Sequence, residues 1–216
     1  MSTGGVTAAA TEVVAPARAS QRLRVIDAAL SCIARAGTKK TTVDDVAREA
    51  EVSRATLYRT FPGGKDAIFA AVVETELARF FSTVAIAMGR AADLEEVLVN
   101  GICVSATYLS NHAAIAYLCD HEPDLVLQRL VFGQMDQTLE LCSTFAQPFF
   151  ARFLDPVAAA RGAELAVRVI VSYLMSPSPS TNLQSEAEVQ ALVRAFILPG
   201  VEALASSSAV PVAPHV

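Results

Sequence analysis

The apolar positions of this chain repeat with the period of a helix. From Leu23 to Ile33 they step by 3, 4 and 3, which predicts an amphipathic helix that ends at Gly37. After Lys65 the chain continues in long apolar segments that are poor in glycine. We predict helices there over residues 66–90, 93–110, 112–120, 123–154, 157–175 and 186–205. The alternation with period 2 that is typical of strands is scarce. The sequence therefore predicts an all-α protein.

Two short helices lie between these regions. Thr42 and Asp45 form a predicted capping box, in which each side chain accepts from the other residue's amide, and the helix that follows ends near Ala50. A few residues later, Ser53 is a predicted N-cap for a helix that ends at Phe61, before a Pro-Gly-Gly break. Two short helices joined by about three residues form a helix-turn-helix, whose second helix can enter the DNA major groove.

These patterns divide the chain into four parts. Residues 1–20 are rich in Ala, Thr and Gly without an apolar period, and we expect a disordered tail there. A three-helix helix-turn-helix domain over residues 21–66 follows, and then a larger helical domain over residues 67–205. Residues 206–216 are expected to form a flexible C-terminal tail.

Composition adds a charge asymmetry to this division. The chain has 216 residues, 53% of them hydrophobic and 18% charged, with a net charge of -5, which is typical of a folded globular protein. Residues 1–66, however, hold ten Lys and Arg against seven Asp and Glu, and all three lysines of the chain. A basic head of this kind can attract a polyanion such as DNA. The alternative is a chance fluctuation of surface charge.

Several other classes of protein are disfavoured. The longest uncharged run, residues 97–119, holds several polar side chains, so buried helices are favoured over a membrane span. The N-terminus lacks a cationic start followed by an apolar block, and we expect a cytoplasmic protein. The four cysteines form no CxxC pair, and the group Cys119-Asp-His121-Glu122 matches no metal-site spacing. Motifs of catalysis are absent too, so we expect no metal, no cofactor and no enzyme.

The stretch from Gly37 to Lys65 resembles the N-terminal domain of the tetracycline-repressor (TetR/AcrR) family. The matched positions are Gly37, Thr42-Val43, Val46-Ala47, Ala50, Val52-Ser53, Thr56-Leu57-Tyr58, Phe61 and Lys65. One departure is Glu51, where the family usually has glycine in the turn. A left-handed backbone there would cost a non-glycine residue about 1 kcal/mol. The resemblance implies a DNA-binding domain followed by a helical ligand-binding and dimerisation domain.

The early, outward side chains of the second short helix are the candidates for reading bases. Arginine can donate two hydrogen bonds to guanine, so Arg54 is the first of these, although a solvated surface arginine is the alternative. By the family's pattern, Thr42, Tyr58 and Lys65 contact phosphates, and Tyr58 could instead belong to the core. The full set of predicted DNA-binding residues is Thr42, Ser53, Arg54, Ala55, Thr56, Tyr58, Arg59 and Lys65.

The larger domain offers candidates for two further surfaces. Aromatic and polar side chains typical of a small-molecule cavity recur in it, although ordinary core is the favoured interpretation for each aromatic residue taken alone. The predicted ligand-binding residues are Tyr108, His112, Tyr117, Phe132, Met135, Phe145, Phe149 and Tyr173. The last two helices are apolar over so much of their surface that one face should meet a partner subunit. The predicted dimer interface is Leu165, Val169, Leu192, Val193, Phe196 and Ile197.

Together these observations predict a homodimeric DNA-binding regulator, a repressor that binds a palindromic operator and is released by a small hydrophobic effector. The alternative is a hydrophobic-ligand carrier or sensor whose helix-turn-helix no longer binds DNA. Glu51 and the modest positive charge of the head keep that alternative open.

Overall fold

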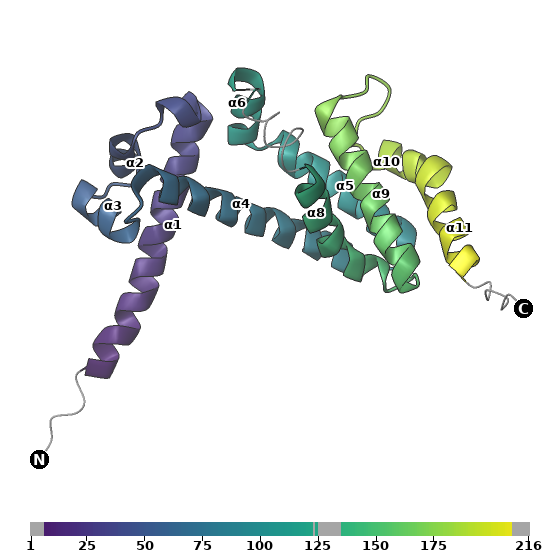
Figure 1. The fold of residues 1–216 in the computed structure, drawn as a ribbon, viewed down its shortest axis with the longest axis horizontal. Coiled ribbons are helices and arrows are strands. Elements are labelled where there is room, and N and C mark those ends of the chain that lie inside the picture. The colour runs from purple at the N-terminus through teal and green to yellow at the C-terminus, as the bar shows by residue number, and fades with distance from the viewer. Residues whose placement is uncertain (1–6, 123, 125–134, 209–216) are drawn as a thin grey trace, which may run out of the picture. The chain divides into compact units, whose positions relative to one another are not determined.

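The computed structural model describes residues 7–122, 124 and 135–208, and the regular elements among them are all helices. Figure 1 shows them in order from purple to yellow. They are α1 (Thr7–Lys40), α2 (Val43–Glu49), α3 (Arg54–Thr60), α4 (Gly64–Gly89), α5 (Leu94–Ser110), α6 (Ala113–His121), α8 (Met135–Phe150), α9 (Pro156–Met175), α10 (Glu186–Leu192), the π-helix η1 (Val193–Ile197) and α11 (Leu198–Ser208). The predicted all-α class is confirmed.

The helices form two compact units, each with its own core. The N-terminal unit holds the residues up to Ala78 together with α6. The C-terminal unit holds Arg79–His112 and the residues from Asp124 onward. The boundary between them therefore falls inside α4, and the chain passes it twice more on either side of α6.

The core of the N-terminal unit fixes α3 in place. Leu57 and Phe61 are 0% and 2% exposed, and they belong to one apolar cluster with Val25 and Ile26 of α1 and Val46 of α2. Burial of a large apolar side chain contributes about 1.5–3 kcal/mol. The contacts of Leu57 and Phe61 are therefore the main source of stability for this short helix.

Local signals set the ends of α2 and α3. The predicted capping box is confirmed: the amide of Thr42 donates to Asp45 at 3.1 Å, and the amide of Asp45 donates to the Thr42 hydroxyl at 3.2 Å. Ser53 is the N-cap of α3, as predicted, and accepts from the amide of Thr56 at 3.1 Å. Between the two helices Glu51 adopts φ 54°, the left-handed conformation that glycine adopts most easily.

The first helix is longer than predicted. It begins at Thr7, where the sequence analysis placed a disordered tail through residue 20. Alanine is the strongest helix former, so an alanine-rich stretch can extend a helix that the apolar stripe after Leu23 has nucleated. At the other end Gly37 leaves the helical conformation (φ 78°, ψ 175°), so the predicted stop at this residue appears as a break, followed by one more turn to Lys40.

The placement of α6 also differs from the expectation that residues 112–120 belong to the larger helical domain. Ala114 is 4% exposed in the apolar core of the N-terminal unit, and Leu118 packs against that core. The main contacts of α6 are with α1. A helix that follows α5 in sequence thus completes the N-terminal unit.

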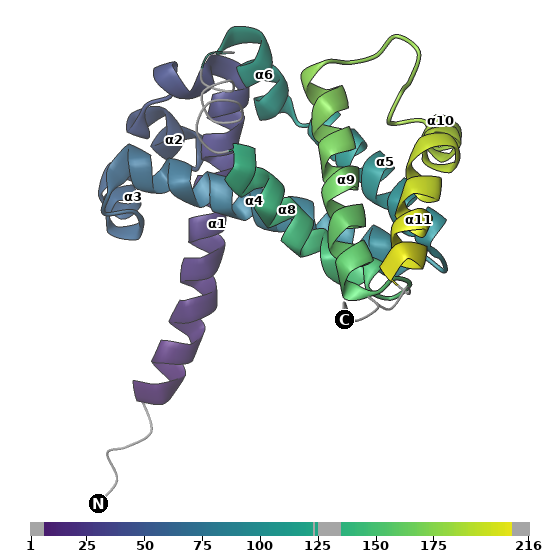
Figure 2. The ribbon, with the colours of Figure 1, turned by 45° about the vertical axis from the view of Figure 1, so that its right-hand side comes forward.

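In the C-terminal unit, α5, α8, α9 and the last helices pack around one apolar core. Figure 2 shows α9 and α11 side by side. Its fully buried side chains include Leu98 and Ile102 of α5. Arg152, just after α8, donates hydrogen bonds to the carbonyl oxygens of Met88 and Ala91 at 3.2 and 2.7 Å, and so satisfies the free end of α4.

The predicted segments and the observed helices agree in part here. Residues 93–110 and 157–175 correspond to α5 and α9, whereas the predicted helix over 123–154 is represented by α8, and residues 125–134 lie outside the described residues. The predicted last helix is divided by a π-turn at Val193–Ile197. In the part of the chain that the structure describes, none of the helices has the length and apolar character needed to span a membrane.

The left-handed turn residue yields the first prediction. Replacing Glu51 by glycine should raise the free energy of unfolding by about 1 kcal/mol, because glycine adopts positive φ without the steric cost of a Cβ atom. Urea denaturation of the two proteins at equal concentration measures the difference. Glu51→Ala is the control, since it removes the charge but keeps the Cβ atom, and it should not stabilise. A glycine variant no more stable than the alanine variant would contradict the steric explanation.

Candidate nucleic-acid interface and effector site

Helix α3 presents one polar face to solvent. Leu57 points into the core, while Arg54, Ala55 and Arg59 are exposed and Thr56 is half-buried. The hydroxyl of Ser53 lies 2.9 Å from that of Thr56, so these two residues are used in capping the helix. The exposed side chains at the start of α3 that take no part in its cap are therefore those of Arg54 and Ala55.

The predicted base-reading arginine is held by neighbouring side chains. The Arg54 guanidinium lies 3.3 Å from the Asp44 carboxylate and 5.7 Å from the centre of the Tyr58 ring. A hydrogen bond with Tyr58 and the charge of Asp44 raise the pKa of Arg54 above its ordinary value, so it stays protonated. Both Arg54 and Asp44 are largely exposed, and exposed ion pairs are weak. The guanidinium can therefore leave Asp44 for a stronger partner.

The predicted phosphate contacts lie on the surface of the same unit. Thr42 is exposed at the start of α2, and Tyr58 is 40% exposed, so the core alternative for Tyr58 does not hold. Lys65 is half-buried because its ammonium group lies over the Phe69 ring, 5.2 Å from the centre. Arg22, which was not among the predicted contacts, is exposed, and its guanidinium lies 4.5 Å from the centre of a core ring, that of Phe61.

Three of the predicted ligand-binding residues come together in a row of aromatic rings. Phe81 of α4 lies 4.5 Å from Phe145 of α8, measured between ring centres, and Phe145 lies 5.6 Å from Phe149. Phe80 is 5.3 Å from Phe81 and 5.5 Å from Tyr108 of α5. Sequence reasoning missed Phe80 and Phe81, although two adjacent phenylalanines on a long helix were a visible signal.

The other predicted ligand residues are not part of this row. The His112 ring lies 6.0 Å from that of Tyr108 at the end of α5. Tyr117 lies in the N-terminal unit, where its ring stacks on His121 at 4.2 Å, so it does not join the C-terminal cluster. Tyr173 packs against the C-terminal core. Phe132 lies outside the described residues, as does the side chain of Met135.

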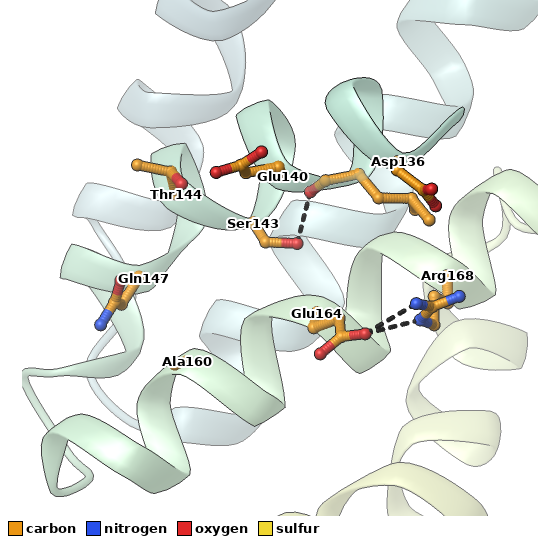
Figure 3. A pocket seen from close by; sticks show the side chains of 9 residues that line it. Asp136, Glu140, Ser143, Thr144, Gln147, Ala160, Glu164 and Arg168 are labelled. Carbon is orange, nitrogen blue, oxygen red and sulfur yellow. Dashed lines mark hydrogen bonds and ion pairs between the residues drawn. The ribbon is translucent and has the colours of Figure 1, made fainter. Parts of the chain in front are cut away.

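A pocket of about 390 Å³ lies between α8 and α9 (Figure 3). Most of its lining residues have polar side chains, and none of them is a predicted ligand residue: Asp136, Leu139, Glu140, Ser143, Thr144, Gln147, Ala160, Glu164 and Arg168. Glu164 and Arg168 form an ion pair of 2.8 Å across its wall. Among the residues that the structure describes, no three His, Cys, Asp or Glu side chains are grouped as metal ligands.

The predicted dimer residues fall into two groups. Phe196 is 76% exposed and Leu165 is 37% exposed, so both are available to a partner. Val193 and Ile197 are buried in the subunit's own core, which leaves these two little surface for a partner. Val169 and Leu192 are half-buried and pack against that core, so for them the interface stays a prediction. Within the last helix, the π-turn separates Phe196 from Val193 and Ile197. It has more residues per turn than an α-helix, which rotates Phe196 away from its buried neighbours.

An exposed, capped second helix on a buried three-helix core defines a helix-turn-helix domain, a class of DNA-binding module. The sequence profile of bacterial regulatory proteins of the tetR family matches residues 25–72, from the second half of α1 into α4. These residues of the chain therefore resemble the N-terminal DNA-binding domain of TetR-family transcriptional regulators.

The chain is similar to known regulators in sequence and to solved structures in fold. The HTH-type transcriptional regulator MT1294 of Mycobacterium tuberculosis is 25% identical over 179 residues, which cover 82% of this chain and 83% of that protein. The TetR family repressor AlkX from Dietzia sp. strain DQ12-45-1b has a similar fold, with a TM-score of 0.60 and 22% identity over 84% of this chain and 95% of AlkX. The fatty acid degradation regulator FadR from Bacillus halodurans has a TM-score of 0.52 and 22% identity, over 80% and 94%.

Proposed function

We propose that the protein is a cytoplasmic, homodimeric repressor that binds a palindromic operator and leaves it when a small apolar molecule binds the C-terminal unit. The observation that carries the proposal is the geometry of α3. A buried Leu57 and a Ser53 cap hold the helix so that Arg54, Ala55 and Arg59 face solvent.

In this proposal the exposed residues of the N-terminal unit have two roles. Arg54 donates to guanine in the major groove, and the methyl group of Ala55 contacts a thymine methyl. Thr42, Tyr58 and Lys65 contact phosphates and so set the register of α3 on the duplex. Asp44 holds the Arg54 guanidinium until DNA replaces it.

The second prediction separates these two roles. Lys65→Met should weaken binding to all DNA sequences and reduce the slope of log affinity against log salt by about 1, because one phosphate contact is lost. Methionine keeps a long side chain beside Phe69 without the charge. Arg54→Ala should instead relax base preference at one position per half-site, at about 1–3 kcal/mol for the preferred base. Fluorescence anisotropy with DNA from upstream of the protein's own gene measures both effects.

The matched control is Arg90→Ala, which removes an exposed charge from the C-terminal unit and should leave the salt slope and base preference unchanged. If both test variants bind like the wild type, α3 is not the reading helix. If the wild type itself binds no DNA from this region, the alternative of a hydrophobic-ligand carrier replaces the regulator.

The aromatic row is the proposed effector site. Its rings present an apolar surface contributed by α4, α5 and α8. AlkX is implicated in the biodegradation of n-alkanes and FadR regulates fatty acid degradation, which supports a long-chain aliphatic effector. The two α3 helices of a dimer must lie about 34–36 Å apart to enter successive major grooves. An effector that binds better to a form with another spacing lowers operator affinity by that difference in binding.

The third prediction concerns this effector. Among straight-chain alkanes and fatty acids, at least one compound should raise the melting temperature and, over the same concentration range, release a labelled operator. At 100 times its dissociation constant the stabilisation should be about 2.7 kcal/mol. Phe81→Ala should abolish both responses, whereas Phe153→Ala, a phenylalanine outside the row, should keep them. A series that produced neither response in the wild type would contradict an aliphatic effector.

The fourth prediction concerns the dimer. Leu165 and Phe196 are exposed apolar side chains on the last helices. Replacing both by glutamate should convert the dimer to a monomer, because buried unpaired carboxylates oppose association. Sedimentation velocity at micromolar concentration measures the change. Ile86→Glu, at an exposed position of α4, is the control. A double variant that remains dimeric would place the interface elsewhere.

A further inference from the structure

The break in α1 leaves backbone amides that need acceptors. At Gly37 the chain leaves the helical conformation, and one helical turn follows over residues 38–40. The first amides of a helical segment have no acceptor inside it. Those of Thr38 and Lys39 are in this position, because the break removes the carbonyl groups that the preceding turn would offer.

Glu122, at the end of α6, supplies the acceptor. Its carboxylate accepts from the Thr38 hydroxyl at 2.5 Å and from the Lys39 amide at 3.4 Å, across 84 and 83 positions of sequence. Burial, with Glu122 only 8% exposed, would raise the pKa of this carboxyl. Hydrogen bonds from Thr38 and Lys39 outweigh it and hold the pKa below its ordinary value. Glu122 thus acts as a charged N-cap donated by another helix.

The break residue itself is fitted to this carboxylate. A Cβ atom on Gly37 would lie 2.1 Å from a Glu122 carboxylate oxygen and 2.8 Å from the Tyr117 ring. Gly37 also has a positive φ, so glycine is required there both for its backbone conformation and for space. The close approach of Glu122 to the turn therefore depends on glycine at position 37.

The capped turn leads directly to the surface proposed to meet DNA. Thr41 is 1% exposed and bonds back to the Gly37 carbonyl, with its hydroxyl at 2.7 Å. The next residue, Thr42, is the N-cap of α2 and a proposed phosphate contact. The exposed side chain of Lys39 is on the same turn. A group that fixes the turn therefore fixes where α2 begins.

We propose that Glu122 is a positioning residue for operator binding: by capping the turn after Gly37 it holds Thr42 in register with the phosphate backbone. The inference rests on the proposed function, since it requires Thr42 to contact the operator. It assigns α6 a part in DNA binding although α6 carries none of the proposed contacts.

The fifth prediction tests this role in the full-length protein. Glu122→Gln keeps the shape but places an amide beside the donors, and Thr38→Val removes the hydroxyl. Each should lower operator affinity by roughly three- to tenfold, because the turn must then be ordered on binding. Thr38→Ser keeps the hydroxyl and should bind within about twofold of the wild type. Fluorescence anisotropy well below the melting temperature measures the affinities, and circular dichroism checks the fold.

A double-mutant cycle distinguishes positioning from general stability. In a Thr42→Ala background the effect of Glu122→Gln should shrink, whereas in a Lys65→Met background it should remain complete. An undiminished effect in the Thr42→Ala background would overturn the positioning role, as would wild-type affinity in both Glu122→Gln and Thr38→Val. Neither result would affect the proposed function, which is tested by binding of the wild-type protein itself.

Hydrogen exchange of the free protein provides a test that needs no DNA. The amides of residues 38–42 should exchange faster in Glu122→Gln than in the wild type, while those of α3 should be unchanged. Equal exchange in residues 38–42 would overturn the proposal even if the operator were not yet known. Should Glu122→Gln fail to fold, the Thr38→Val and Thr38→Ser pair gives the same comparison.

Discussion

A helix of seven residues does not persist alone in water, so α3 depends on the burial of Leu57 and of Phe61 just beyond its end. This apolar contact decides which side chains of α3 can face outward. Because Leu57 points into the core, the residues on the opposite side of α3 face solvent. These are Arg54, Ala55 and Arg59. The chemistry available to DNA is thus a consequence of core packing more than of the polar residues themselves.

Much of the DNA-binding unit could be predicted because its signals are local. Thr42, Asp45 and Ser53 identify the starts of two helices from side-chain chemistry within four residues, and the turn position of Glu51 follows from the same spacing. The place of α6 could not be predicted in this way. The hydrogen bond between Glu122 and Thr38 joins positions that are far apart in sequence. The apolar pattern of α6 predicts a buried helix but does not indicate which of the two cores it packs into.

The candidate effector site shows the same limit. Tyr108, Phe145 and Phe149 were recognisable as aromatic residues in apolar helices, but their grouping with Phe80 and Phe81 depends on how three helices pack. Polar contacts between helices fix that packing at particular points. Asn100 of α5, for example, donates to the Ala87 carbonyl oxygen of α4 at 3.2 Å.

The π-turn has a consequence for how the last helix tolerates changes of length. The buried residues Val189, Val193, Ile197 and Val201 are spaced by four, and in a regular α-helix each such step would drift by about 40° around the axis. The wider turn at Val193–Ile197 cancels part of that drift and keeps all four on one side. It holds, in effect, one extra residue. Deleting a residue here would restore an ordinary helix without turning the flanking segments, whereas a deletion elsewhere in the helix would rotate everything beyond it by about 100°.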